Sequence, residues 1–431
     1  MKIKTKVLDL DTVLSMVPKK HIRPKKPNIL FRTLLKIVSV PDLLATRFTY
    51  KKIGMEKLKK NEPCLYLMNH SSFIDLKIVS HILYPRPFNI VCTSDGFVGK
   101  NWLMRNLGCV PTKKFITDSV LVRDMVYCAK KLGSSILIYP EASYTFDGTA
   151  TPLPDSFAKC VKMLGIPVVM IKTFGAFSRD PLYNCLQRRK VKVGATMEYI
   201  LSPEDIKAKS VEEINGIITE QFTFDGFRWQ QENGVKITEN FRADGLNRVL
   251  YKCPHCESEG KMQGSGTHIV CEKCGAKYHL DELGFLKAEN VEPKFNHIPD
   301  WYNWERECVR KELRNGTYNL ETEVDIMMLV DTSCVYKVGS GTLTHTENGF
   351  TLKGCDGKLN FSIPPSASYS LYSDYFWYEI GDVICIGDSK ALYYCFPKDK
   401  KDIVAKTRLA TEELYKLKVL AYIRTRPAKR N

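Results

Sequence analysis

An Asn-His-x-x-x-x-Asp pattern at Asn69, His70 and Asp75 is the part of the sequence best suited to acid–base chemistry. A neutral imidazole can take the proton of an alcohol while a carboxylate fixes its tautomer and stabilises the imidazolium that forms. Residues five apart point about 140° away from each other on one regular helix, so the pair can meet only if His70 lies on a loop and Asp75 in the first helical turn. A simpler interpretation is also open, because Ser72-x-x-Asp75 is a capping box.

Three further segments carry polar groups beside apolar runs. An apolar run from Ile136 stops at Pro140, and Glu141 follows it as a candidate catalytic acid or as a solvated loop residue. The segment from Gly108 ends in Lys113 and Lys114, which could hold a phosphate or form an ordinary surface pair. The segment 165–170 is typical of a buried strand.

Two Cys-x-x-Cys pairs predict a metal site. Cys253 and Cys256 are separated from Cys271 and Cys274 by fourteen residues, a spacing typical of four thiolates around one tetrahedral ion. Soft sulfur ligands favour Zn2+, and four protein ligands close the site, so we predict a structural zinc ribbon. Nearby alternative ligands are His255, His268 and His279. Free buried thiols would leave the spacing unexplained.

The elements that position these residues read as an α/β domain with a mainly parallel sheet and flanking helices. The expected strands are Cys64–Met68, Asn89–Thr93, Ser135–Tyr139, Pro167–Phe174 and Val191–Ile200, and the expected helices include Ser72–Leu83, Thr117–Leu132 and Asp155–Leu164. Chemistry in such sheets usually lies at the carboxyl ends of the strands. The His70 and Glu141 motifs both fall there.

Composition and turn signals divide the chain further. The sequence is 44% hydrophobic and 26% charged, without a repeat that we can find, so a mainly disordered chain is excluded. We expect a basic amphipathic docking segment (1–50), the α/β domain (51–235), the zinc ribbon (245–288), a linker helix (289–320) and a β-rich domain with a closing helix (321–431). Hairpin-turn signals indicate the last domain, which resembles a pleckstrin-homology-type or GRAM-type barrel.

The positive charge lies mostly at the N-terminus. The net charge is +16, and residues 1–60 alone hold 16 Lys or Arg against 4 Asp or Glu. Between Pro27 and Tyr50 these charges interleave with apolar residues, which favours an anionic membrane surface over a solvated tail. Aromatic residues scarcely interleave with them, so nucleic acid is the less favoured partner. No apolar run is long enough to span a membrane, and the N-terminus lacks the short apolar core of a signal peptide. We expect a cytoplasmic protein, peripheral on the inner face of the cell membrane.

The order and spacing of the four segments resemble the glycerolipid acyltransferase family, which includes 1-acylglycerol-3-phosphate (lysophosphatidate) acyltransferases. The resemblance covers roughly residues 54–221 and implies that Asn69, His70 and Asp75 are catalytic positions and that Lys114 binds phosphate. The family's Pro-Glu-Gly-Thr-Arg block reads Pro140-Glu141-Ala142-Ser143-Tyr144 here. Because Tyr144 replaces an arginine, a bidentate phosphate ligand of the family is missing.

The expected function is transfer of a fatty acyl group from acyl-CoA or acyl-carrier protein to a lysophospholipid hydroxyl, within phospholipid biosynthesis. Catalysis is assigned to His70, Asp75 and Glu141, and substrate binding to Asn69, Gly108, Lys113, Lys114 and Pro140. One alternative keeps the reaction and changes the acceptor. Another is a zinc-ribbon module that binds nucleic acid or protein and carries an inert acyltransferase motif.

Overall fold

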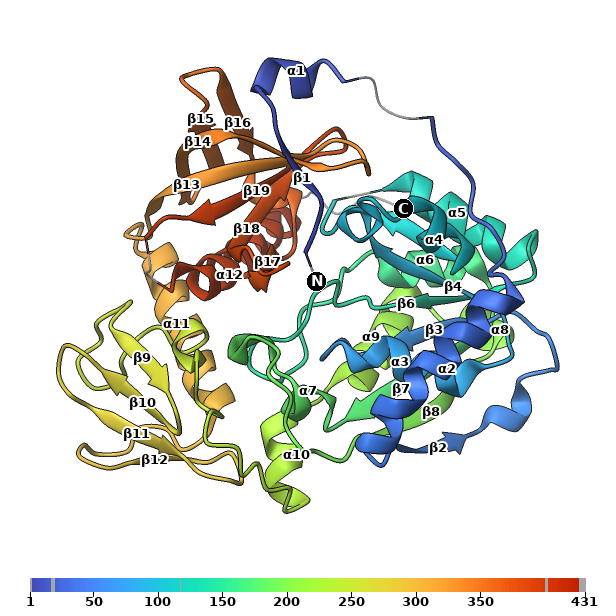
Figure 1. The fold of residues 1–431 in the computed structure, drawn as a ribbon, viewed down its shortest axis with the longest axis horizontal. Coiled ribbons are helices and arrows are strands. Elements are labelled where there is room, and N and C mark those ends of the chain that lie inside the picture. Colours follow the sequence, from blue (N-terminus) through green and yellow to red (C-terminus); the bar gives the residue numbers. More distant parts are fainter. Residues whose placement is uncertain (1, 17–19, 117, 400–401, 426–431) are drawn as a thin grey trace.

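The computed structural model describes residues 2–16, 20–116, 118–399 and 402–425. Figure 1 shows an α/β layer on one side of the molecule and, on the other, a small four-stranded ribbon and a larger β sheet with its own helix. The long helix α11 (Ile298–Arg314) lies between the ribbon and the larger sheet. The active-site candidates lie on the α/β side.

Seven strands form the sheet of the α/β layer in the order β2-β8-β7-β3-β6-β4-β5. All neighbours run parallel except β7 and β8, which confirms the predicted α/β class with a mainly parallel sheet. The strands are β2 (Thr49–Ile53), β3 (Leu65–Met68), β4 (Phe88–Thr93), β5 (Cys109–Thr112), β6 (Ser135–Ile138), β7 (Val168–Phe174) and β8 (Gly194–Leu201). The edge strands β2 and β5 were not predicted, since both are short and only partly apolar.

The two faces of this sheet bury alternate residues of the same strand, as the period of two requires. In β3, Tyr66 and Met68 pack with α3 (Ile74–Leu83), whereas Leu65 and Leu67 pack with helices on the opposite face. Those helices are α5 (Ser119–Lys130), α6 (Phe157–Leu164) and α9 (Val211–Phe222), with α8 (Pro203–Ala208) beside them. Both faces are therefore covered, and β3 is the buried centre from which the His70 loop leaves.

Shorter elements lie in the connections between strands of the α/β layer and in the segment that leads from it to the ribbon. They are η1 (Met55–Lys57), η2 (Ser94–Phe97), α4 (Asn101–Asn106), α7 (Ala176–Arg179), η3 (Leu182–Asn184), α10 (Gly226–Glu232) and η4 (Leu246–Arg248).

The segment 1–50, expected as one docking unit, is divided between two parts of the fold. Strand β1 (Thr5–Val7), followed by α1 (Leu10–Leu14), pairs in parallel with β14 of the C-terminal sheet. Helix α2 (Ile29–Ala45) instead packs along α3. The physical reason is that the first residues of β14, which lie beyond its pairing with β15, offer a free edge to β1, while α2 has an apolar face that needs a partner.

The ribbon consists of β9 (Met262–Ser265), β10 (His268–Cys271), β11 (Lys277–Leu280) and β12 (Leu286–Ala288), all antiparallel. Helix α11 lies beside it in Figure 1, and Trp301 of this helix is fully buried and donates an indole hydrogen bond to the carbonyl of Lys252 at 2.9 Å. The predicted linker helix is thus also a packing partner of the ribbon.

The C-terminal sheet has the order β16-β15-β14-β13-β19-β18-β17, with β1 added to β14. Its strands are β13 (Leu320–Leu329), β14 (Val335–Thr346), β15 (Gly349–Gly354), β16 (Leu359–Ile363), β17 (Tyr372–Trp377), β18 (Gly381–Gly387) and β19 (Leu392–Pro397), with η5 (Pro365–Ala367) before β17. Helix α12 (Ile403–Thr425) packs on this sheet and on α11. A small β-rich part with a closing helix is present, and its kinship to pleckstrin-homology or GRAM barrels stays a prediction.

Candidate active site

His70 and Asp75 meet where β3 passes into α3. His70 lies on the loop, and Asp75 lies in the first turn of α3, with His70 Nδ1 3.1 Å from Asp75 Oδ2. The His70 side chain is 20% exposed and that of Asp75 is 1% exposed. Because Nδ1 faces the carboxylate, it carries the proton in the neutral ring, and Nε2 has no hydrogen-bond partner among the residues that the structure describes. Nε2 is therefore free to accept a proton.

Asp75 serves the helix start as well as the histidine. Its Oδ2 also accepts hydrogen bonds from the backbone N–H groups of Ser71 at 2.9 Å and Ser72 at 3.1 Å. These bonds satisfy donors that a helix N-terminus otherwise leaves without a partner. The capping and the histidine-orienting interpretations of the motif are thus compatible, because one carboxylate oxygen makes both sets of contacts.

Two bonds across the sheet hold the His70 loop in place. Asn69 joins the loop to β7, since its Oδ1 accepts from Thr173 N at 2.8 Å. Glu141 joins it to the segment after β6, because one of its oxygens accepts from His70 N at 3.1 Å and the other from Thr151 N at 2.8 Å. Asn69 and Glu141 are both buried. They therefore brace the loop from two neighbouring strands.

Two tyrosines that sequence analysis did not assign to the site flank the imidazole. The ring centroid of His70 lies 4.1 Å from that of Tyr139 and 4.2 Å from that of Tyr144. Burial lowers the pKa of His70, Asp75 opposes this shift, and the nearby charge of Lys114 adds to it. The resulting preference for neutral imidazole suits a general base.

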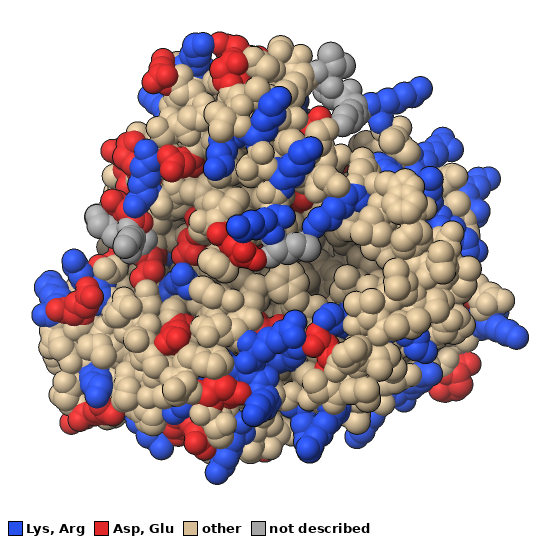
Figure 2. All heavy atoms as spheres, viewed as in Figure 1, with Lys and Arg blue, Asp and Glu red and all other residues tan. Residues whose placement is uncertain are grey.

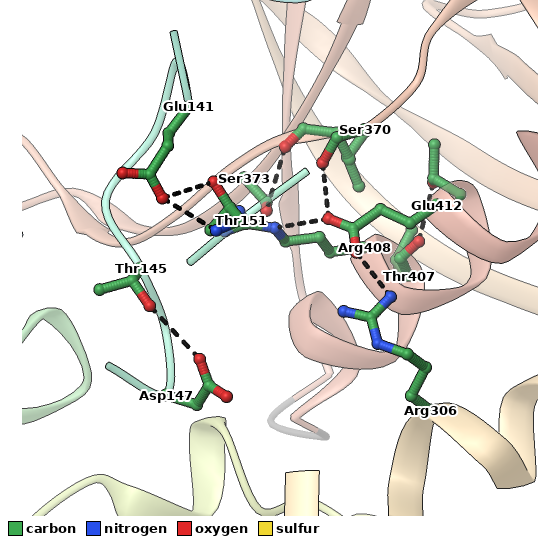
Figure 3. A network of polar contacts seen from close by, with 12 residues as sticks. Glu141, Thr145, Asp147, Thr151, Arg306, Ser370, Ser373, Thr407, Arg408 and Glu412 are labelled. Atoms are coloured by element: carbon green, nitrogen blue, oxygen red, sulfur yellow. Dashed lines mark hydrogen bonds and ion pairs between the residues drawn. The ribbon is translucent and has the colours of Figure 1, made fainter. Parts of the chain in front are cut away.

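Glu141 belongs to a polar network that reaches the C-terminal helix. Burial raises the pKa of Glu141 to about 7, against the hydrogen bonds from Thr151 and His70 and the charge of Arg408, which lower it. Figure 3 shows Glu141 and Thr151 facing Arg408 and Glu412 of α12. Arg408 Nη1 donates to the carbonyl of Tyr144 at 3.4 Å, and its guanidinium lies 4.4 Å from the ring centre of Phe146.

The two predicted phosphate ligands follow β5 and point toward the C-terminal sheet. Lys113 Nζ donates to the carbonyls of Asp388 and Ser389 in the turn between β18 and β19. Lys114 Nζ lies 4.2 Å from the ring centre of Tyr372 in β17. Of the two, Lys114 is the one whose charge reaches His70.

Gly108 and Pro140, the other two residues predicted to bind substrate, are packed against other parts of the chain. Gly108 precedes β5 and lies at the amino end of that strand, whereas Lys114 lies beyond its carboxyl end. A Cβ on Gly108 would come within 2.9 Å of Pro27. The structure does not bring Gly108 to His70. Pro140 is buried at the end of β6, and its carbonyl lies 3.5 Å from the hydroxyl of Tyr369.

Ala142 occupies the position where the family block has glycine, and its backbone is left-handed, with φ of 57°. Such a conformation costs an L-residue roughly 1–2 kcal/mol and costs glycine nothing. The turn it makes is held by Ala142 N, which donates to the carbonyl of Tyr139 at 2.9 Å. The turn that places Glu141 thus persists without glycine.

The four predicted metal ligands converge in the ribbon. The ligand atoms of Cys253, Cys256, Cys271 and Cys274 all lie within 4.8 Å of one another. Two of the sulfur pairs, Cys253 with Cys274 and Cys256 with Cys271, are 3.7 Å apart. Four sulfurs about 2.3 Å from one tetrahedral ion would be separated by about 3.8 Å, so the cluster fits a metal of that size.

A hollow separates the two sides of the molecule. In Figure 2 it lies near the middle of the face shown, between the C-terminal half and the α/β layer, and both basic and acidic side chains stand around it.

Comparisons with known proteins find similarity in the part of the chain that holds this site. Residues 50–172 match the model of the Acyltransferase family. A chloroplastic 1-acyl-sn-glycerol-3-phosphate acyltransferase of Brassica napus is 29% identical over 131 residues, which are 28% of this chain and 36% of that protein. The chain thus matches about a third of the length of this curated relative.

Among solved structures, the 1-acyl-sn-glycerophosphate acyltransferase PlsC of Thermotoga maritima is 16% identical, with a TM-score of 0.35, over 44% of this chain and 76% of that one. The segment 50–172, which contains His70, Asp75 and Glu141, is thus the part of the chain that is similar to the Acyltransferase family.

Proposed function

We propose that the protein transfers a fatty acyl group from a thioester, acyl-CoA or acyl-carrier protein, to the free hydroxyl of a lysophospholipid, in the first instance 1-acylglycerol-3-phosphate. The observation that carries the proposal is the contact of 3.1 Å between His70 Nδ1 and Asp75 Oδ2, which leaves Nε2 open. Acylation of an alcohol needs a base at that position.

The reaction follows from the contacts of His70. Nε2 takes the proton of the acceptor hydroxyl, whose oxygen attacks the thioester carbonyl, and Asp75 stabilises the imidazolium. The carbon–sulfur bond then breaks, and the leaving thiolate takes the proton back from the imidazolium. A thiol with a pKa of roughly 8.5 leaves without a separate general acid, so one base suffices.

Glu141 acts as a positioning residue in this mechanism. Its two oxygens accept from His70 N and from Thr151 N, so the carboxylate fixes the backbone of the loop and does not face the imidazole Nε2. Asn69 has the same function on the β7 side. Lys114 is the residue that we assign to the acceptor phosphate, because its ammonium is near His70 and makes no ion pair within the described part of the chain.

An apolar surface next to the site is proposed as the membrane contact. Helix α2 exposes six apolar side chains by 51–72%: Ile29, Leu30, Leu34, Ile37, Val38 and Leu44. Trp102 of α4 is 70% exposed and packs edge-on against Phe31 of α2. Phe73 is 60% exposed and lies three residues from His70 in the sequence. Figure 2 shows this region over α2 and α3 as largely uncharged. In the described residues, no helix is long and apolar enough to cross a bilayer.

The membrane contact predicts vesicle binding through α2. Replacing Leu30 and Val38 by serine should weaken binding to vesicles containing phosphatidylserine by about tenfold or more, because each buried apolar side chain contributes about 1.5–3 kcal/mol. The matched control is Ile380→Ser, because Ile380 is 41% exposed and lies in the turn between β17 and β18 of the C-terminal sheet. Equal binding of all variants in a vesicle sedimentation assay would exclude α2 as the docking surface.

Zinc is the metal proposed for the four-cysteine cluster, in a structural role. Thiolate sulfurs select it, and four protein ligands leave no open position for chemistry.

The decisive experiment is a panel of lyso-acceptors offered with acyl-CoA or acyl-carrier protein to the wild-type chain and to His70→Ala. We expect turnover that disappears in the variant while its thermal unfolding remains cooperative. Turnover that persists in His70→Ala would refute the assignment. Since Tyr144 stands where the family block has arginine, turnover with other lipids but none with lysophosphatidate would change the acceptor and keep the reaction.

A further inference from the structure

A cavity of about 330 Å³ lies between the two halves of the molecule. Its lining includes apolar side chains from the segment after β5, from the C-terminal sheet and from α12, among them Phe115, Ile116, Phe350, Ile386, Leu392 and Leu414. We call it the interdomain cavity. An apolar cavity of roughly 150 Å³ holds one benzene, so this one admits on the order of ten hydrocarbon carbons.

One cationic side chain lies in the lining of this apolar cavity. The charged side chains that line it are Lys114 and Asp388, and the carboxylate of Asp388 accepts from the backbone of its own turn. His345 also lines it, but burial lowers its pKa to about 3 and its Nδ1 lies 2.9 Å from the Tyr318 hydroxyl. Lys114 is thus the cation available to a ligand.

Lys114 connects the cavity with the catalytic base. Its ammonium lies over the ring of Tyr372, with Asp95 and Asp374 nearby, yet it has no ion pair or hydrogen bond in the described ranges. The same charge acts on His70. A ligand with an anionic group on Lys114 can therefore extend a hydrocarbon chain into the cavity and present a neighbouring polar group to His70.

We propose that the interdomain cavity binds the acyl chain of the lysophospholipid acceptor, whose phosphate contacts Lys114 and whose hydroxyl faces His70. The inference rests on the function proposed above and assigns its acceptor site partly to the C-terminal sheet and α12. The acceptor fits the lining better than a two-chain lipid, since one apolar cavity receives one chain. The C-terminal half then selects the chain length of the acceptor.

The turn η5 offers a matched pair of variants. Ala367 lines the cavity and is exposed to solvent, so Ala367→Trp can place its indole in the cavity without removing a core side chain. Its neighbour Ser366 is exposed in the same turn and does not line the cavity. Ser366→Trp therefore adds the same side chain at the same turn and leaves the cavity open.

The first measurement is kcat/KM for lysophosphatidates of increasing chain length with one fixed donor. In the wild type and in Ser366→Trp, each methylene that enters the cavity should raise kcat/KM by about fourfold until the cavity is full. Ala367→Trp should reach its plateau at a shorter chain. Identical profiles for the two tryptophan variants, or a change confined to the chain length of the donor, would overturn the proposal.

A second measurement needs no turnover and so separates this inference from the proposed function. Calorimetric titration of long-chain lysophosphatidate into His70→Ala should show binding that Ala367→Trp weakens and Ser366→Trp does not. Lys114→Met should weaken binding of lysophosphatidate more than binding of the uncharged monoacylglycerol. A fatty carboxylate that binds more tightly than lysophosphatidate would make this a free fatty acid site and overturn the assignment to the acceptor.

Discussion

Replacing Asp75 by asparagine tests the catalytic pair at a single atom. The amide oxygen can take the place of Oδ2 and go on accepting from Ser71 N, Ser72 N and His70 Nδ1, so the start of α3 and the tautomer of the ring are kept. The NH2 group then takes the place of Oδ1, which has no hydrogen-bond partner in the described part of the chain. The variant therefore removes the negative charge that stabilises the imidazolium.

The size of the effect follows from the charge that is removed. A carboxylate and an imidazolium about 4 Å apart interact by roughly 4 kcal/mol at an effective permittivity of about 20. Asp75 is 1% exposed, so water screens this attraction little. Loss of about 4 kcal/mol from the transition state lowers kcat by about 10³-fold.

The pH profile gives an independent readout. Catalysis needs neutral His70, whose pKa burial lowers from 6.5, so kcat/KM of the wild type should fall with acid only below pH 6.5. Asp75 raises that pKa, so removing its charge should move the acidic limb to still lower pH.

A thioester assay that follows thiol release from acyl-CoA, run across pH, measures both effects. Asp118→Asn is the control, because Asp118 caps α5 through Val120 N and Leu121 N and should tolerate the amide without loss of rate. An Asp75→Asn enzyme within tenfold of the wild type, with the same pH profile, would refute the base assignment.

Three further outcomes are expected. Ala142→Gly should raise the free energy of unfolding by about 0.5–1 kcal/mol in chemical denaturation, because φ of 57° strains alanine, whereas Ala150→Gly in the same segment should lower it or leave it unchanged. Glu141→Gln should flatten the dependence of stability on pH. The pKa of Glu141 in the folded protein is raised to about 7, so the free energy of unfolding of the wild type should fall by about 3 kcal/mol as pH rises from about 4.5 to about 7, and the variant should lack this fall. Cys256→Ser should lower zinc content below one ion per chain and lower the melting temperature, since a structural site of this kind contributes about 10–16 kcal/mol of binding. An unchanged melting temperature after chelation, an unaltered slope in Glu141→Gln, or a less stable Ala142→Gly would contradict the respective argument.

The sequence was sufficient wherever the information is local. His70 and Asp75 are five residues apart, and a loop followed by a helix start is enough to bring them together. The cysteine pairs likewise specify a cluster by their spacing, and alternation of apolar runs with helical periodicity was enough for the α/β layer. Each of these patterns describes residues that are close in the chain, so few conformations can satisfy it.

The surroundings of the base depended on the tertiary structure. Glu141 reaches the backbone of His70 across 71 residues, and Arg408 reaches the carbonyl of Tyr144 across 264. Phe146, close to Glu141, is buried in the same core as the ribbon and the C-terminal sheet. No sequence pattern near Lys114 predicts its contact with Tyr372, and none near β14 predicts its pairing with β1.

The physical reason is that hydrophobic periodicity reports which side of an element is buried, but not which distant element covers it. The partner is chosen by the packing of the whole chain, where many distant contacts compete for the same apolar surface and hydrogen-bonding edge. The sequence therefore determined the candidate reacting groups, and the tertiary structure determined their neighbours, their access to solvent and the cavity near them.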